Sequence, residues 1–169
     1  MNPHRFTWCV TSRISHTTID SRNAYQQSLW WSQVLGMRED PEDSNEPDHE
    51  ECMIFSADGR IRLLFIAVPE AKQVKNRLHF DVRPTDTTRD EEVTRLLRLG
   101  ATEIADHRRP DGSGWVTLAD PEGNELDVLR GDSEFTDPYA HLITGRRAPD
   151  PNAAAPFPRP VIPGPLRAQ

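Results

Sequence analysis

Two kinds of hydrophobic spacing alternate along the chain. Leu78, Phe80 and Val82 occupy every second position of residues 76–84, whereas Val93 and Leu96 have the spacing of one helix face. Successive side chains of a strand point to opposite faces, so the first pattern predicts a strand with one apolar side. The second pattern predicts an amphipathic helix. The chain therefore combines short strands with helices.

The predicted elements form two sets in the same order. Each set opens with a strand and a helix and closes with further strands: 13–20, 21–36, 52–56 and 60–68 in the first set, and 76–84, 87–100, 102–108, 115–120 and 124–130 in the second. Both helices end in Leu-Gly, so Gly36 and Gly100 are expected to close them in the left-handed conformation. Thr88 and Glu91 have the spacing of a capping box at the start of the second helix.

Equivalent residues recur at nearly equal intervals in the two sets. The markers are a first-strand histidine, the glycine that closes the helix and the glycine of a later turn: His16, Gly36 and Gly59 in the first set, and His79, Gly100 and Gly123 in the second. The interval between the two glycines is the same in both sets, and the interval from histidine to first glycine differs by a single position. This agreement indicates a repeat. We therefore predict an α+β fold of two βαβββ modules, module one at 13–75 and module two at 76–130.

Three further segments lack this pattern. Residues 39–51 hold eight acidic residues and two prolines, which predicts a solvated loop. Residues 148–169 carry seven of the fifteen prolines, and we expect the C-terminal extension 131–169 to be largely irregular. Residues 1–12 are predicted to form an N-terminal extension.

Charge and composition narrow the class of protein. The net charge of −7 provides no basic face for nucleic acid or an anionic membrane, and no apolar stretch is long enough to span a bilayer. No basic segment followed by an apolar run opens the sequence, so we expect a cytoplasmic protein. Cys9 and Cys52 make no CxxC pair and are expected to act as small hydrophobes.

Strand alternation gathers polar side chains on one sheet face. His79 lies opposite Leu78 and Phe80, and Glu125 and Asp127 share one side of strand 124–130. His16 is expected on the equivalent face of module one. Such a face is either wetted by solvent or lines a pocket.

Apolar residues of module one favour the pocket. Ile61, Leu63 and Phe65 alternate along strand 60–68, and we assign them to the equivalent face of their sheet. Apolar side chains on that face indicate an enclosed lining in which polar groups converge.

The stretches ISHTTID, RLHFDV and WVTLADPEGNELDVL resemble the vicinal oxygen chelate superfamily, and most of all its glyoxalase-like domains, over residues 13–130. The resemblance implies curved, mostly antiparallel sheets that close around one cavity. It also implies a divalent metal held by the first and last strands of each module. These positions fall on His16, His79 and Asp127, and on Leu63, which is apolar.

The resemblance implies a metal-dependent enzyme of lyase, isomerase or dioxygenase type that acts on a small oxygenated substrate. Two histidines and one carboxylate suit iron(II), manganese or zinc, and nickel or cobalt are further candidates. Glu125 is the candidate general base, and Leu63, Phe65 and Trp115 are candidate substrate contacts. Relatives often pair, so we expect a homodimer. For Asp127 a pairing with an arginine is the plain alternative.

Two other functions remain open. The first is a metal-free binding protein of the bleomycin-resistance type, which would hold an aromatic or cationic compound. The second is a small hydrolase or dehydratase that uses Glu125 and His79 without a metal. In each case the partner is a small molecule.

Overall fold

The computed structural model describes residues 12–134. The first module contains β1 (Thr17–Ser21), α1 (Ala24–Leu35), β2 (Glu51–Phe55) and β3 (Arg62–Ala67). The second contains β4 (Phe80–Val82), α2 (Arg89–Arg98), β5 (Thr102–Asp106), β6 (Val116–Ala119) and β7 (Glu125–Val128). Every predicted helix and strand is confirmed, with ends that differ by a few residues. The predicted extensions 1–12 and 131–169 fall almost wholly outside the described range.

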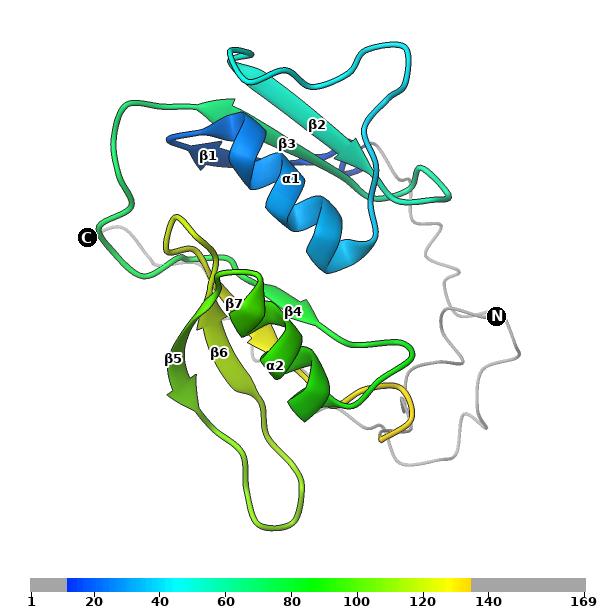
Figure 1. Cartoon of the computed structure of the whole chain (residues 1–169), viewed down its shortest axis with the longest axis vertical. Coiled ribbons are helices and arrows are strands. Elements are labelled where there is room, and N and C mark those ends of the chain that lie inside the picture. Colours follow the sequence, from blue (N-terminus) through cyan, green and yellow to red (C-terminus); the bar gives the residue numbers. More distant parts are fainter. Residues whose placement is uncertain (1–11, 135–169) are drawn as a thin grey trace, which may run out of the picture. The chain divides into compact units, whose positions relative to one another are not determined.

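The strands form two sheets, ordered β1-β3-β2 and β4-β7-β6-β5. In each sheet the first and last strands of the module pair in parallel, and the other pairings are antiparallel. Figure 1 shows α1 lying across the first sheet and α2 across the second. The α+β class with two mostly antiparallel sheets is therefore confirmed. Neither helix in the described range has the length and apolar character that a bilayer crossing requires.

The first sheet has one strand fewer than the second. The chain between α1 and β2 forms only isolated bridges there, Arg38 with Phe55 and Asp40 with Asp43. This is the acidic segment with two prolines, whose mutual repulsion and missing N–H groups oppose a regular strand. The predicted loop at 39–51 is confirmed up to Glu51, which begins β2.

One apolar core runs through both modules. Phe65, Leu118 and Leu126 are each 0% exposed and belong to one cluster. Trp31 of α1 joins the modules, because its ring lies 5.3 Å from that of Phe80 and its Nε1 donates to Asp120 Oδ2 at 3.2 Å. Large apolar surfaces buried in this way supply the main stabilising free energy of such a domain.

The helix ends follow from local sequence. Asn23 caps α1 by accepting the N–H of Gln26, and Gly36 closes the helix with φ 62°. Thr88 and Glu91 form the predicted capping box of α2, and Gly100 follows with φ 99°. The positive φ explains glycine at both closing positions, since other residues are strained there.

The two hairpins that precede β3 and β7 differ in length. Phe55 pairs with Arg62, which leaves 56–61 as the first loop, whereas Ala119 pairs with Glu125, which leaves the shorter loop 120–124. A single offset along the chain therefore relates the parallel pair Thr17–Leu63 to the pair Phe80–Leu126. The offset between the turn glycines Gly59 and Gly123 is one position larger than this. Equivalences counted from these glycines therefore assign the residues of β3 to the wrong face of the sheet.

The register change reverses the face assigned to module one. Leu63 is equivalent to Leu126, and Phe65 lies opposite Cys52, whose thiol contacts Ser28 of α1. Leu63 and Phe65 thus face the helix, and their predicted position on the opposite face is wrong. A shift of one residue moves every side chain of a strand to the other side.

Candidate metal centre and adjacent cavity

Three potential metal ligands meet on the second sheet. His79, Asp81 and Asp127 each offer one ligand atom, and these atoms all lie within 4.8 Å of one another. His79 Nε2 is 3.3 Å from Asp127 Oδ2 and 3.5 Å from Asp81 Oδ1. Among residues 12–134 this is the one group of three or more such side chains with this spacing.

Strand pairing creates this arrangement. Asp81 of β4 is the direct partner of Asp127 of β7, so their side chains lie side by side. Phe80 and Leu126 form the preceding pair and point to the core on the other face. Thr117 of β6 faces Asp127 and donates its hydroxyl to Oδ1 at 2.6 Å. This bond fixes the Asp127 carboxylate while Oδ2 stays beside the imidazole.

The donor set fits a divalent cation. One imidazole and two carboxylates are the ligand types that manganese, iron(II) and zinc accept. The side chain of Asp127 is only 15% exposed, and those of His79 and Asp81 are 35% and 56% exposed. Two neighbouring carboxylates repel each other, and a cation between them would relieve that repulsion.

His16 lies outside this group. It precedes β1 in the first module, is exposed, and its Nδ1 is 3.2 Å from the hydroxyl of Ser15. The structure therefore brings together two of the three predicted ligands, His79 and Asp127, and adds Asp81. The role of His16 stays a prediction.

Leu64, rather than Leu63, is the counterpart of Asp127. The pair Thr18–Leu64 corresponds to the pair Asp81–Asp127 at the offset that strand register defines. The fourth position is still apolar, although the residue assigned to it was wrong. The turn glycines alone did not reveal the extra residue in the first hairpin loop.

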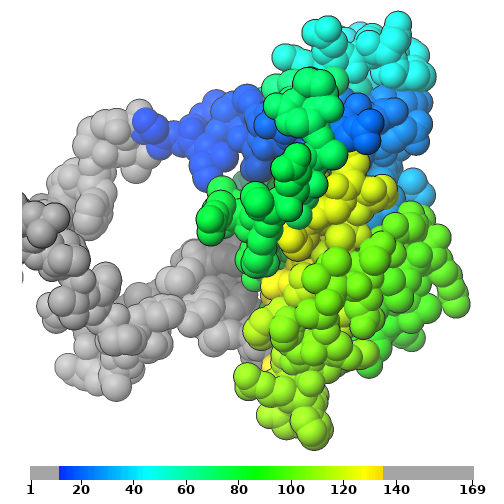
Figure 2. All heavy atoms as spheres, turned by 90° about the vertical axis from the view of Figure 1, so that its left-hand side faces the viewer, coloured from blue at the N-terminus to red at the C-terminus, as the bar shows by residue number. Residues whose placement is uncertain are grey.

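Glu125 is engaged in an ion pair. Lys72 Nζ lies 3.0 Å from its Oε2, and the backbone N–H of Asn76 donates to the same oxygen at 3.0 Å. Burial alone would raise the pKa of Glu125, but the bonds from Asn76 and Lys72 outweigh burial and hold the pKa below its usual value. These contacts attach the connecting segment 68–79 to the start of β7. Figure 2 shows that segment in green beside the yellow residues. The role of Glu125 as a base stays a prediction.

Trp115 directly precedes β6, an inner strand of the second sheet. It is 36% exposed, and its ring lies 4.9 Å from that of His107. It does not line the cavity next to His79. Its predicted contact with substrate stays a prediction.

A cavity of about 490 Å³ borders His79. Its walls come from β1, the connecting segment, the start of β4 and the loop before β7. Pockets of about 300 to 1,000 Å³ are typical for small organic ligands. A metal group beside such a cavity is an arrangement in which an ion and a substrate can meet.

Sequence reasoning missed two residues of this region. Asp81 shares a strand face with His79, and this alternation was a usable signal. Lys72 lies in a connecting segment without periodicity, so nothing in the sequence indicated that it pairs with Glu125.

These observations define a protein of paired strand-helix-strand modules with a candidate metal group on one sheet. A model of the glyoxalase-like domain family matches residues 16–129. The chain therefore belongs to the glyoxalase-like domain family.

Solved structures with the same fold have low sequence identity. The fosfomycin resistance protein FosX of Mesorhizobium loti is 18% identical, with a TM-score of 0.51 over 69% of this chain and 90% of that chain. A glyoxalase/bleomycin resistance protein/dioxygenase family enzyme of Burkholderia phytofirmans PsJN is 24% identical, with a TM-score of 0.51 over 68% and 94%. FosX of Listeria monocytogenes, solved with Mn(II) and sulfate, is 16% identical, with a TM-score of 0.54 over 71% and 90%. No protein with a curated description matches the sequence.

Proposed function

We propose that this chain is a metal-dependent enzyme in which His79, Asp81 and Asp127 hold a divalent cation. The observation that carries the proposal is the convergence of three ligand atoms within 4.8 Å on one sheet face. Membership of the family supports it, as does the Mn(II) bound by FosX of Listeria monocytogenes. Manganese and iron(II) suit the donor set best, and zinc, nickel and cobalt remain candidates.

Different parts of the site bind the ion and the substrate. A bound cation supplies Lewis-acid stabilisation of negative charge on a substrate oxygen. Thr117 orients Asp127 through its hydroxyl, and such supporting contacts tune ligands in metal sites. The cavity beside His79 holds the organic part of a small oxygenated substrate. The reaction is of lyase, isomerase or dioxygenase type.

Thermal denaturation of protein without a histidine tag tests the metal site, with added Mn(II), Fe(II), Zn(II), Ni(II) and Co(II). An ion at about 100 times its dissociation constant stabilises a folded protein by about 2.7 kcal/mol. We expect this stabilisation in the wild type and its loss in Asp127→Ala and His79→Ala. Glu103→Ala, at an exposed position of β5, is the control and should keep it.

His16→Ala tests whether His16 is a metal ligand, as the sequence predicts, or whether His79, Asp81 and Asp127 are sufficient. Because His16 lies outside the group, we expect this variant to keep most of the stabilisation by metal. Loss as complete as in Asp127→Ala would show that the three residues of the second sheet are insufficient. No stabilisation of the wild type by any of the five ions would refute the metal-dependent enzyme.

A metal-free binding protein is the second candidate. It is favoured by one observation, which is that Asp81 and Asp127 do not line the cavity next to His79. Ligand binding that is equal in the presence of a chelator and of metal would support it.

A homodimer is also proposed. Within the described residues, β1 and β4 each pair with one strand only and have a free edge. Ile14, which leads into β1, is 87% exposed. Free strand edges with apolar neighbours can take up a second chain. Sedimentation analysis at several protein concentrations tests this proposal.

A further inference from the structure

The cavity next to His79 has apolar walls. Ile19, Val68, Ala71, Leu78 and Phe80 line it. Leu78 is 88% exposed although it lies beside a cavity large enough for a small organic molecule. An apolar body bound there would remove this leucine from water, which is favourable in proportion to the area covered.

The same cavity carries many carboxylates and few cations. Five acidic side chains line it, and Lys72 is the single ammonium among the lining residues, with His79 as the single imidazole. The acidic residues are Asp20, Glu70, Asp120, Glu122 and Glu125. A concave surface lined by one sign of charge attracts ligands of the opposite sign.

Three of these carboxylates have internal partners. Asp120 accepts hydrogen bonds from Trp31, from Asn124 and from the backbone N–H of Glu122. Glu122 accepts the backbone N–H groups before α1, and Glu125 pairs with Lys72. These groups are satisfied within the fold and do not require a ligand.

The other two carboxylates have no such partner. Asp20 of β1 and Glu70 of the connecting segment are exposed, and neither side chain makes a hydrogen bond or ion pair with the described residues. Since the one ammonium of the lining already pairs with Glu125, nothing among the lining residues neutralises Asp20 and Glu70. The charge available to a ligand is therefore negative.

We infer that this cavity selects small organic cations, with an ammonium group beside Asp20 and Glu70 and an apolar body against Leu78 and Phe80. The inference deepens the proposed function and rests on it, because the cavity borders the metal group through His79. It narrows the small oxygenated substrate of the proposed function to one that also carries an ammonium group and an apolar body. It names Asp20 and Glu70 as the residues that determine this specificity.

Three probes with the same phenyl body test the inference: 2-phenylethylamine, 2-phenylethanol and 3-phenylpropanoate. They carry a positive charge, no charge and a negative charge at neutral pH. Their affinities are measured by saturation-transfer NMR and calorimetry on the full chain in low salt. We expect the amine to bind about tenfold more tightly than the alcohol, since two partly exposed ion pairs contribute about that much. The carboxylate should bind most weakly.

The double variant Asp20→Asn/Glu70→Gln should bring amine and alcohol to within about threefold of each other. Its control is Asp48→Asn/Glu103→Gln, which removes the same total charge from exposed positions outside the cavity and should keep the preference. Equal or tighter binding of the alcohol or carboxylate by the wild type would overturn the inference. So would absent binding of the amine, or a preference that survives the double change at Asp20 and Glu70.

Each titration is repeated with a chelator and with Mn(II). The metal-dependent enzyme and the cation selectivity of the cavity are thereby tested independently of each other. The probes lack paired oxygens and do not need the ion, so the amine preference should appear in both conditions. Amine preference without any stabilisation by metal would refute the metal-dependent enzyme alone. Stabilisation by metal without amine preference would refute the cation selectivity alone.

Discussion

The two modules share an order of elements but differ on the sheet face opposite the helix. In the second module Asp81 and Asp127 form a cross-strand pair beside His79. The equivalent pair of the first module is Thr18 and Leu64, which contains no charged group. The same backbone pairing thus supports a candidate metal group in one copy and an uncharged pair of residues in the other. Equivalent residues are identified by strand register, because hairpin length varies between copies.

The substitutions with the largest expected effect on stability test the register of β3 and β7. Leu63→Ala and Leu126→Ala should each lower the free energy of unfolding by about 2–5 kcal/mol, since both remove a core side chain and leave a cavity. The two residues are 1% and 0% exposed. Urea denaturation measures the loss, and Leu78→Ala, at an 88% exposed position, is the control. If Leu63→Ala behaved like Leu78→Ala, the helix-side placement of β3 would be wrong.

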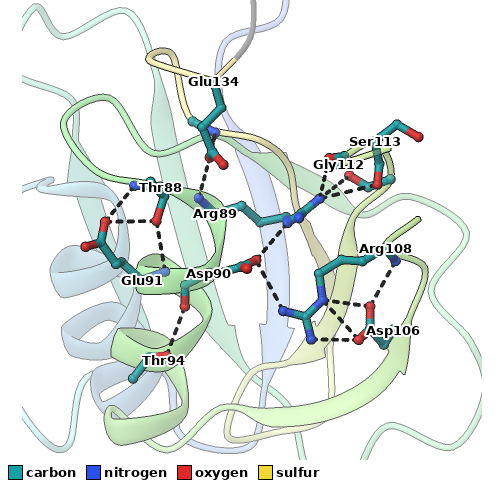
Figure 3. A network of polar contacts seen from close by, with 12 residues as sticks. Thr88, Arg89, Asp90, Glu91, Thr94, Asp106, Arg108, Gly112, Ser113 and Glu134 are labelled. Atoms are coloured by element: carbon teal, nitrogen blue, oxygen red, sulfur yellow. Dashed lines mark hydrogen bonds and ion pairs between the residues drawn. The ribbon is translucent and has the colours of Figure 1, made fainter. Parts of the chain in front are cut away.

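A smaller effect is expected from a polar network that only the second module has among the described residues. Arg89 is buried, and its guanidinium donates to the carbonyl oxygens of Gly112 and Gly114 at 3.3 and 3.1 Å. Figure 3 shows Asp90 between Arg89 and Arg108, so that α2 is tied to the loop between β5 and β6.

Arg89→Met should lower the free energy of unfolding by about 1–3 kcal/mol, because it leaves these carbonyl oxygens without their donor. Hydrogen exchange should also accelerate in residues 107–114. Arg98→Met, on an exposed face of the same helix, is the control. Unchanged exchange in that loop would mean that it is held without Arg89.

The smallest effect concerns the helix caps. Thr88→Ala and Asn23→Ala should each lower the free energy of unfolding by about 1 kcal/mol, through loss of one capping bond. The caps differ in pH dependence, because hydrogen bonds from Thr87 and Thr88 lower the pKa of Glu91 to about 2. A lowered pKa stabilises the fold above the usual carboxyl pKa, and this contribution is lost as pH falls through about 2.

Glu91→Gln should therefore be less stable than the wild type near neutral pH and equal to it at the acid end. Thermal denaturation as a function of pH measures the difference. A gap between the two proteins that does not close in acid would mean that ionised Glu91 is not what completes the cap.

Most of the fold could be predicted because the strands alternate regularly and the helices carry their own end signals. The capping box at Thr88 and the closing Gly36 depend only on neighbouring residues, so local sequence was sufficient. The face of Leu63 could not be predicted, since it depends on a hairpin loop one residue longer than its counterpart.

Part of the candidate site could also be predicted, because strand alternation fixes the direction of some side chains. His79 and Asp127 were found because each is flanked by apolar residues that fix its direction. Asp81 was visible on the same strand face and was not given a role. The partner of Glu125 could not be found, because Lys72 lies in a connecting segment without periodicity and far from Glu125 along the chain.

The first sheet has one strand fewer than the second, and this difference affects how the protein avoids aggregation. Among the described residues no further strand borders β2, whose outer backbone groups bond instead to the side chain of Asn45 at Met53 and to Arg38 at Phe55. A border without a full neighbouring strand can still take up another chain, and proteins commonly discourage this with charge. The carboxylates of residues 39–51 would repel an identical chain that approached this border. Aggregation should therefore begin once acid neutralises them.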